Sequence, residues 1–414
     1  MKKQILIATG LAVLSTSAYA TKARLEALGQ DTTDGSLWIA DSYNKFRNAA
    51  HVNMYKNYVV TEWGTEDQAG GNEEKLEGGY FRESGSFSYG VYFNRENSEQ
   101  DTIAQTGIDN VTIGSAGYTF TGHDVEGFKE AENGIDLFFG GDMGVQWGAR
   151  IHYAKSENGI TRAAATNANN EKYNQEHSAL GLGLGMVMGD LQAYANIDFK
   201  NEYTGTDNVD TDSKSDTMEA DTGINLGVSY ALGDIAIAVD YDKEGADLKD
   251  QSDTTVSTEN YEKSAITVAV GHTHEVSSTA RVYSSIAYSS ISYESNFDSS
   301  GELKAQEIKA SSLPLMIGFE ADANSWLTLR GSVTQDFIIS TDEFSDASTE
   351  NAADTNDEDK GSASTTMAAG ATLNFGKLKV DGIISNTLGS DANTSESDLT
   401  TDNLMSKVSV HYWF

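Results

Sequence analysis

The alternation of apolar and polar residues along most of this chain constrains its fold more than any other feature of the sequence. In the stretch ALGLGLGMVMG, Leu180, Leu182 and Leu184 alternate with small residues, and the pair Gly189-Asp190 follows. In LQAYANIDFK, directly after that pair, every second residue is again apolar. Successive side chains of a β-strand point to opposite faces, so each stretch predicts a strand with one apolar and one polar face. Strands of this kind, joined by tight turns, are typical of membrane-spanning β-barrels.

The same unit recurs along the chain and predicts an all-β fold, an antiparallel up-and-down transmembrane barrel of about sixteen strands. An even number is what a single-chain bacterial barrel needs. The stretch 121–143 could hide a further short strand pair, so fourteen or eighteen strands also fit the sequence. The predicted strands lie near 53–63, 76–83, 86–95, 110–120, 144–155, 177–188, 191–201, 219–232, 235–244, 260–272, 279–293, 308–320, 326–338, 362–375, 378–387 and 403–414.

The predicted connections alternate between short and long, which is typical of a barrel with short periplasmic turns and long outer loops. Short connections are expected at Ser84-Gly85, Gly189-Asp190, Gly233-Asp234, Glu275–Ser278, Asp322–Ser325 and Gly376-Lys377. Long loops are expected near 64–75, 96–109, 156–176, 202–218, 245–259, 294–307, 339–361 and 388–402. The third long loop, by its position only, is the candidate for a constriction.

The amino terminus predicts export across the inner membrane. Residues 1–20 combine two lysines, a short apolar run and an A-x-A site, which is the layout of a secretory signal peptide cleaved before Thr21. We therefore expect export by the Sec pathway, a segment over 21–52, and a transmembrane barrel over 53–414 in the bacterial outer membrane. The segment over 21–52 could plug the barrel from the periplasm, lie along the membrane interface or contact a neighbouring protomer.

The carboxy terminus, KVSVHYWF, predicts the strand that closes the barrel. Backbone groups in lipid must all be paired, so the last strand must join the first. The alternating residues that end in an aromatic also resemble the signal by which the barrel assembly machinery recognises its substrates. These predicted closing and assembly residues are Val408, Val410, Tyr412 and Phe414.

Composition excludes several classes of protein. The net charge of −35 argues against nucleic-acid binding, and the absence of cysteine excludes a disulfide scaffold. Much of the acidic surplus falls in the predicted outer loops, above all in Ser340 to Gly361, where eight acidic residues face only Lys360. That stretch is either a solvated loop or a site for divalent cations, and it lacks the spacing of an EF-hand.

No motif predicts catalysis, and we expect neither an enzyme nor a cofactor. The sequence has no G-x-S-x-G element. His177 and Ser178 are neighbours on a predicted strand, so their side chains point to opposite faces. His272 and His274 share a face, but no third or fourth metal ligand is spaced to join them, so they are expected to be an interfacial polar pair.

Alternation also separates the residues that should face the lumen from those that should face lipid. A mixed polar lining fits either a water-filled interior or salt bridges across a filled barrel. The predicted lumen-lining residues are Arg82, Arg150, His152, Asp198, Lys200, Asp240, Arg330 and Asp336, with Tyr194, Asn196 and Asn225 beside them. Small lipid-facing residues, which are either contacts to a neighbouring barrel or ordinary strand residues, are Ala149, Ala193, Ala195, Ala369 and Ala371.

Two resemblances to known families begin in the amino-terminal segment. The residues Arg24, Ala27-Leu28-Gly29, Asp41, Asn48 and Ala49 resemble the opening R-x-x-A-L-G … D … N-P-A of FadL-like barrels for hydrophobic solutes, although Pro is missing before Ala49. The opening GSLWIADSYNKFRNAAHVN, with LFFGGDMGVQWGA and SWLTLRGSV later in the chain, is similar to the PopA-like porin-like barrels of predatory bacteria. The second resemblance implies a homo-oligomer, a ring that encloses membrane lipid.

Three functions therefore compete. The first is a porin for passive diffusion of small hydrophilic, cation-preferring solutes. The second is a PopA-like structural ring oligomer without an open pore, and the third is FadL-like uptake of hydrophobic solutes. The third needs an apolar internal pocket, which the predicted lumen residues do not supply. The expected partners are outer-membrane lipids and lipopolysaccharide, further copies of the chain, the barrel assembly machinery and hydrophilic solutes, but no nucleic acid.

Overall fold

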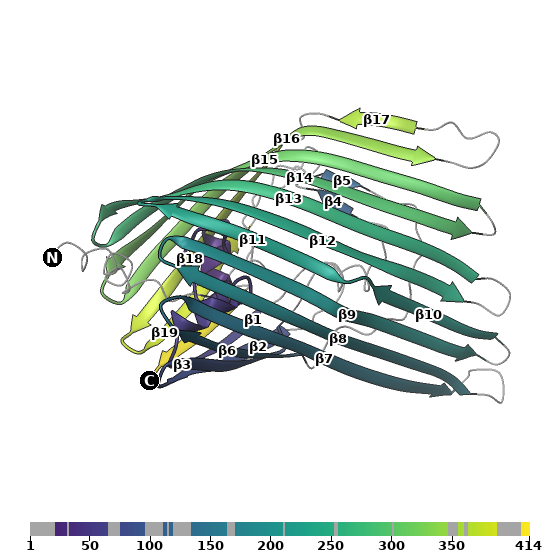
Figure 1. Ribbon diagram of the computed structural model, residues 1–414, viewed down its shortest axis with the longest axis horizontal. Helices are drawn as coiled ribbons and strands as arrows, with labels where there is room; N and C mark the ends of the chain where they lie inside the picture. The colour runs from purple at the N-terminus through teal and green to yellow at the C-terminus, as the bar shows by residue number, and fades with distance from the viewer. Residues whose placement is uncertain are drawn as a thin grey trace.

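The alternating stretches pair into a closed antiparallel β-barrel in the computed structural model of the chain, and the first described residues, 21–30 and 33–57, lie inside that barrel (Figure 1). Among the residues that the structure describes, no helix is long and apolar enough to cross a membrane. The predicted signal peptide, 1–20, lies outside them. The described residues are 21–30, 33–64, 75–95, 111–113, 116–118, 134–163, 170–209, 212–251, 256–299, 302–346, 355–359, 363–386 and 407–414.

Sixteen strand positions form the ring, which confirms the predicted fold class. β10 and β11 share one position, because both pair with β9 and with β12, and β17 extends the position of β18 beside β16. In ring order the strands are β1 (Tyr58–Gly64), β2 (Lys75–Ser84), β3 (Phe87–Phe93), β6 (Ile135–Asp142), β7 (Gln146–Ala163), β8 (Asn170–Met188), β9 (Leu191–Val209), β10 (Asp212–Ala220) with β11 (Gly223–Leu232), β12 (Ile235–Gln251), β13 (Val256–Ser277), β14 (Ala280–Ser299), β15 (Glu302–Asn324), β16 (Leu327–Asp346), β17 (Thr355–Asp359) with β18 (Ala363–Phe375), β19 (Leu378–Asn386) and β20 (Lys407–Trp413).

The fourth barrel strand is not where the sequence predicted it. The described residues of the predicted strand 110–120 form β4 (Val111–Ile113) and β5 (Ala116–Tyr118), which pair with each other in a separate two-stranded sheet. The barrel position is taken by β6, in the stretch 121–143. Its alternation is stronger, with Leu137 and Phe139 on the outer face, and a tight turn at Gly144 joins it to β7.

Several strands are far longer than predicted. β13 has 22 residues and β15 has 23, about twice the length that a tilted strand needs to cross a membrane. Most of the predicted loops 156–176, 202–218, 245–259 and 294–307 are therefore barrel wall, and the predicted constriction loop is continued β7 and β8. The sequence there is polar on its outer face, which hides the alternation from a search for apolar residues. Of the predicted loop 64–75, residues 65–74 lie outside the described residues, as do the predicted loops 96–109 and 388–402.

Glycines occupy most of the short turns, which lie at one end of the barrel. Glycine adopts a positive φ in five of the tight turns, a conformation that other residues rarely take. These glycines are Gly85, Gly144, Gly189, Gly233 and Gly376. The outer faces of the flanking strands carry exposed apolar side chains, such as Val228, Tyr230 and Leu232 on β11. This end is the one that the sequence predicts to be periplasmic.

The last strand closes the barrel, as the sequence predicts. β20 pairs antiparallel with β1, with Val410 opposite Thr61, and with β19 on its other side. The terminal residue continues this closure: the Phe414 backbone N–H donates to the Asn57 carbonyl at 3.1 Å, and its ring stacks on that of Tyr80. Val408, Val410, Tyr412 and Phe414 all lie on the outer face, opposite to the buried residues Ser409 and His411.

Residues 21–57, which we call the plug segment, lie inside the short-turn end of the barrel (Figure 1). The segment contains the helix α1 (Lys22–Ala27) and two 3-10 turns, η1 (Tyr43–Lys45) and η2 (Ala49–Asn53). The Thr21 side chain accepts from the Arg24 backbone N–H at 3.2 Å and so caps α1 at its start. Gly29, with a positive φ, follows its end.

Candidate functional site: the plugged lumen

The plug segment contacts the barrel wall from β1 round to β20. Most of its side chains are buried, although many of them are polar or charged. Its side chains reach partners on strands that lie far apart around the ring: Lys22 with Glu77 on β2 (3.0 Å), His51 with Gln192 on β9 (2.7 Å), Arg47 with Asp240 on β12 (3.4 Å), Arg24 with Glu320 on β15 (2.8 Å) and Glu26 with Lys407 on β20 (3.0 Å). The plug segment therefore fills the cross-section of the barrel at this level.

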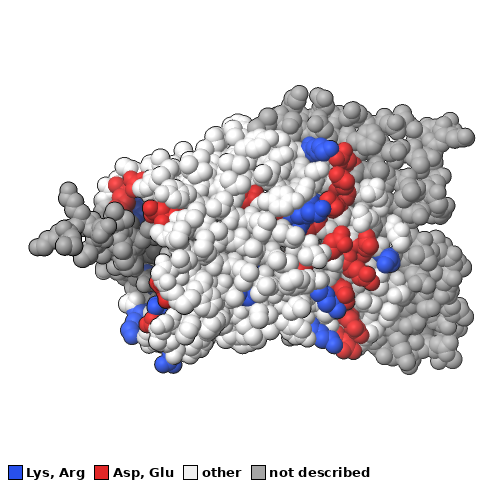
Figure 2. Space-filling view, viewed as in Figure 1, with Lys and Arg blue, Asp and Glu red and all other residues white. Residues whose placement is uncertain are grey.

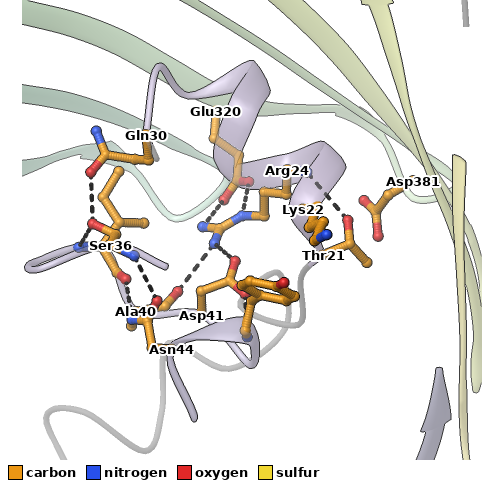
Figure 3. A network of polar contacts seen from close by, with 12 residues as sticks. Thr21, Lys22, Arg24, Gln30, Ser36, Ala40, Asp41, Asn44, Glu320 and Asp381 are labelled. Atoms are coloured by element: carbon orange, nitrogen blue, oxygen red, sulfur yellow. Dashed lines mark hydrogen bonds and ion pairs between the residues drawn. The ribbon is translucent and has the colours of Figure 1, made fainter. Parts of the chain in front are cut away.

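A buried ionic network joins α1 to one side of the wall (Figure 3). The guanidinium of Arg24 donates from Nε to Glu320 at 2.8 Å and from Nη1 to Asp41 at 3.0 Å. On the wall, Arg330 donates to the same Glu320 at 2.6 Å and to Asp381 at 3.1 Å. All five side chains are almost fully buried. Each charge therefore depends on its partners, because a buried charge without a partner is strongly destabilising.

Burial and the neighbouring charges act against each other within this network. Burial lowers the pKa of the Arg24 guanidinium, but the charge of Glu320 outweighs it, so the pKa lies well above its usual range. Burial also raises the pKa of Asp41 to about 6, in spite of the nearby charge of Arg24. Arg24 is thus a fixed positive charge, whereas Asp41 is the member of the plug segment whose proton depends on mildly acidic conditions.

The opposite side of the plug segment is aromatic. The Phe46 ring meets the rings of Tyr92 on β3 and Phe138 on β6 edge to face, with centroids 4.9 and 5.5 Å apart. The Lys45 ammonium lies 4.5 Å from the Phe46 centroid and 4.8 Å from that of Phe81. Burial lowers the pKa of Lys45 to about 8. These rings belong to an apolar core built from the plug segment and strands β1, β2, β3 and β6, which also includes Tyr283 of β14 and Met316 of β15.

Glycines on β7 and β8 let the third side of the plug segment approach the wall closely. A Cβ at Gly185 would lie 2.6 Å from the Ala50 backbone nitrogen and would overlap Asn48. Gly148 on β7 meets the backbone of Ala49 in the same way. A strand surface without side chains is what a backbone needs in order to approach this closely.

The structure brings most of the predicted lumen residues to the inner face. Arg150, His152 and Arg330 are buried inside the barrel. Asp240 faces inward and contacts Arg47 and Tyr194, and Asp198 and Asp336 are only partly exposed on the same inner face. Asp240 and Arg330 thus contact the plug segment or its ionic network, which the sequence did not indicate.

Two of the predicted lumen residues face the other way. Arg82 is exposed on the outer face beside Tyr89, because its neighbour Phe81 turns inward against Tyr58. Lys200 also faces outward, where it forms an ion pair with Glu202 at 2.7 Å. A β-bulge causes this reversal: Leu180 pairs with Lys200 but Gly181 pairs with Asp198, so Phe199 has no partner and the alternation changes phase.

Above the plug segment, the lumen wall carries an apolar cluster that sequence reasoning missed. Its members face inward from β9 round to β15 and are almost fully buried: Tyr203, Met218, Ala246, Leu248, Tyr261, Tyr293, Ile308 and Ala310. Tyr203 also stacks on His177, with ring centroids 4.2 Å apart. Half of these residues, Tyr203, Met218, Ala246 and Leu248, fall in stretches predicted to be loops. A search for apolar residues two apart, such as Ala246 and Leu248, would have found them.

The predicted inter-barrel alanines and the histidine pair lie on the outer face of the barrel. Ala149, Ala193, Ala195, Ala369 and Ala371 face outward, each paired with outward residues on the neighbouring strands. His272 and His274 share the outer face, with ring centroids 6.0 Å apart. In the described parts of the chain, no group of three or more His, Cys, Asp or Glu is placed to hold a metal ion. The whole acidic stretch 340–361 lies outside the residues whose side chains are described.

No protein-family model and no curated protein matches this chain. Among solved structures, it is similar to the toluene transporter TbuX of Ralstonia pickettii, with 11% identity over 96% of this chain and 98% of that chain and a TM-score of 0.32. The TodX deltaS2S3 mutant, a monoaromatic hydrocarbon channel, gives 11% identity over 95% and 99% and a TM-score of 0.38. The translocator domain of the autotransporter NalP from Neisseria meningitidis gives 12% over 66% and 89%, with a TM-score of 0.31.

Proposed function

We propose that this protein is an outer-membrane barrel that the plug segment seals at the periplasmic end, and that it takes an apolar or amphipathic solute into the outer half of its lumen. The observation that carries this proposal is the inward-facing apolar cluster above a filled cross-section. The exposed apolar outer faces of the strands support a place in a membrane, and the short turns support the orientation.

The chemistry of the cluster supports the class of solute. Three tyrosines supply large ring faces, and Leu248, Ile308 and Met218 supply aliphatic and thioether surface. Such side chains bury apolar groups favourably, whereas a channel for ions would leave them in contact with water. In the closed form these side chains are buried, so a solute would replace the contacts that bury them now.

The polarity of the wall supports a plug segment that can leave. Where it meets β8 to β20, the wall offers Asp240, Glu320, Gln192 and other groups that water can hydrate after release. An apolar wall would expose its surface to water instead, at a cost that grows with the area. We therefore propose that passage requires release of the plug segment on its polar side.

An open porin for small hydrophilic, cation-preferring solutes is not what this geometry supports. The plug segment occupies the cross-section that such solutes would need, and the inward charges on the wall are largely engaged with it or with one another. Of the three functions considered from the sequence, FadL-like uptake agrees best with the lumen.

Binding of a small apolar probe tests the proposal. We expect toluene to bind to the protein in lipid nanodiscs and to give saturation-transfer signals, and we expect Tyr261→Ser to weaken binding about tenfold through loss of a ring contact. Tyr241→Ser is the matched control, because Tyr241 lies on the outer face of the same sheet. Equal affinity of the wild type and Tyr261→Ser, or equal loss in the control, would contradict the proposed site.

The sealed lumen and the small outward residues also favour a second function, a structural oligomer that holds membrane lipid. The small side chains of Ala193 and Ala195 on β9 leave space on the outer face for a neighbouring barrel to approach closely. Ala193→Leu with Ala195→Leu would then lower the mass of the assembly in native mass spectrometry. Thr61→Leu, on the outer face of β1, is the control. A monomer in the wild type would exclude this function.

A further inference from the structure

The outer face of β7 to β15 carries two rows of charge where the apolar surface ends. Figure 2 shows them as blue and red bands that cross the barrel next to each other. The row nearer the apolar surface contains the lysines Lys155, Lys200, Lys243 and Lys309. The row farther out contains the glutamates Glu157, Glu176, Glu202, Glu219, Glu262, Glu294 and Glu307.

The order of the rows is the same on different strands. On β9, Lys200 follows the apolar stretch that ends at Phe199, and Glu202 lies two residues farther out. On β15, which runs in the opposite direction, Lys309 again lies inside and Glu307 outside. Because these strands run in opposite directions, a repeated sequence motif would not place lysine inside and glutamate outside on both. A common environment at each level explains the shared order better.

The lysine row lies at the depth of lipid headgroups. The apolar stretch of β9 from Leu191 to Phe199 covers nine residues. Nine residues at about 3.3 Å each, tilted by about 40°, span roughly 23 Å, close to the ~25 Å apolar band of outer-membrane barrels. Acyl chains beside β9 therefore end at the level of Lys200, where the phosphates of a phosphorylated lipid would begin.

The glutamate row limits how far an anionic group can move outward. Glutamates lie directly opposite one another on neighbouring strands: Glu157 with Glu176, Glu202 with Glu219, and Glu262 with Glu294, which also faces Glu307. Like charges in such pairs destabilise a sheet, so fold stability alone does not favour them. Together they repel phosphate from the outer level, whereas the lysines attract it one level below.

The lysine side chains remain partly exposed on the outer face although they form ion pairs. Lys200 and Lys243 form ion pairs with Glu202 and Glu262 at 2.7 and 2.9 Å, yet their side chains are 42% and 44% exposed. An ammonium has three N–H donors, so one ion pair leaves donors for a phosphate. The glutamates also hold the lysines upright at a fixed level.

The two rows are described on β7 to β15, whereas residues 65–74 and 96–110, which follow β1 and β3, lie outside the described part of the chain. At the outer ends of β1, β2 and β3, the described outward side chains are aromatic or aliphatic, such as Trp63, Leu76 and Phe93. Among those described side chains, no lysine or arginine faces outward at this level.

We propose that the face of β7 to β15 is a docking surface for a lipid of the outer leaflet that carries phosphate on its headgroup. The lysine row binds the phosphates, the apolar surface below takes the acyl chains, and the glutamate row sets the depth. This surface lies on the outer face and not in the lumen, so evidence against the proposed solute uptake would leave this proposal unchanged.

Titration with lipid A of two phosphorylation states tests the proposal. Native mass spectrometry of the full chain in neutral detergent should show diphosphoryl lipid A binding more tightly than the monophosphoryl form with the same acyl chains. Replacing Lys155, Lys200, Lys243 and Lys309 by Gln should reduce this preference about tenfold, since each of these exposed lysines contributes only part of the usual ~1 kcal/mol per charge. Lys56→Gln with Lys377→Gln, on the periplasmic rim, is the control and should change nothing.

Three results would overturn the assignment. The first is an unchanged preference in the quadruple variant whose heat-modifiable gel mobility shows a folded barrel. The second is an equal loss in the rim control, which would mean that net charge alone matters. The third is displacement of the bound lipid by inorganic phosphate at the same concentration, which would mean that the surface does not select a lipid.

Discussion

The two sides of the plug segment hold it in the barrel by different physical means. Towards β1, β3 and β6 the contact is aromatic, with Phe46 at its centre. Towards β9, β12 and β15, ion pairs and hydrogen bonds of Arg47 and Arg24 are added to apolar contacts such as that of Met316. The aromatic side adjoins the strand into which the plug segment continues, whereas the ionic side faces it across the lumen.

This difference indicates how the lumen could open. Separating the aromatic side exposes apolar surface to water, which costs about 25 cal/mol for each Å². Separating the ionic side replaces protein partners by water, provided that both partners are hydrated together. The aromatic side is therefore expected to act as the fixed side of the plug segment and the ionic side as the one that releases.

Loss of the central cation should have the largest effect. Arg24→Leu leaves Glu320 and Asp41 buried with too little positive charge, which costs about 3–5 kcal/mol in comparable sites. We expect the plug segment to become open to protease in the folded barrel, while the outward Arg82→Leu leaves it protected. Arg24→Leu with Glu320→Leu should recover part of the protection, and equal cleavage of the single and double variants would contradict the network.

A smaller but still large effect is expected on the aromatic side. Phe46→Ala removes a buried ring and should lower the stability of the plugged state by about 3 kcal/mol, because a cavity remains. Unlike the Arg24 variant, its effect should not change between low and high salt. Protease protection measured at both salt concentrations checks this difference, and the outward Phe87→Ala is the control. A strong salt dependence of Phe46→Ala would remove the distinction between the two sides.

An added methyl group on β8 should have an intermediate effect. Gly185→Ala places a Cβ against Asn48 and 2.6 Å from the Ala50 nitrogen, and overpacking of this kind costs about 1–3 kcal/mol. Gly189 lies in the turn of the same hairpin, where a Cβ meets nothing, although its positive φ disfavours alanine. The temperature at which the plug segment unfolds should therefore fall for Gly185→Ala. Gly159→Ala, on a part of the wall where a Cβ has space, should leave that temperature unchanged.

The smallest effect expected is a pH dependence through Asp41. The plugged state holds the pKa of this carboxyl at about 6, against its usual 3.8, so the plugged state binds the proton more tightly than the released state does. The stabilisation that protonated Asp41 gives to the plugged state is fully present below pH 3.8 and is lost as the pH rises through 6. Protease protection should be greater at pH 4 than at pH 7, by a factor that shrinks in Asp41→Asn. A steeper change in Asp41→Asn would contradict this assignment.

Alternation was enough to predict the barrel, but not the phase of every strand. The outward residues of β11, such as Val228 and Tyr230, follow directly from the pattern. Lys200 does not, because the bulge at Phe199 is decided by pairing with β8 and leaves no mark in the local sequence. Arg82 was misplaced because Tyr80 and Phe81 are both aromatic, and only the contact with Tyr58 decides which one turns inward.

The candidate site was harder to predict than the wall that surrounds it. Arg24, Asp41 and Asn48 stood out in the sequence. However, Glu320, the partner of Arg24, is 296 residues away, and Met186, whose carbonyl accepts from Asn48, is 138 residues away, so only closure of the barrel brings them together. Half of the apolar lumen cluster was placed in predicted loops, because residues such as Tyr203 alternate with acidic and polar residues, which resembles a solvated loop. Period-two burial on strands beyond the membrane was the pattern that could have revealed it.

Single-channel recording tests the central claim, that the plug segment seals the lumen, most directly. The full chain inserted in a planar bilayer should give no steady conductance, and a variant that lacks residues 21–53 should give large, ohmic steps. Heat-modifiable mobility of both proteins would show that each barrel is folded. Steady large steps from the full chain, equal to those of the deletion variant, would show that the plug segment does not close the barrel.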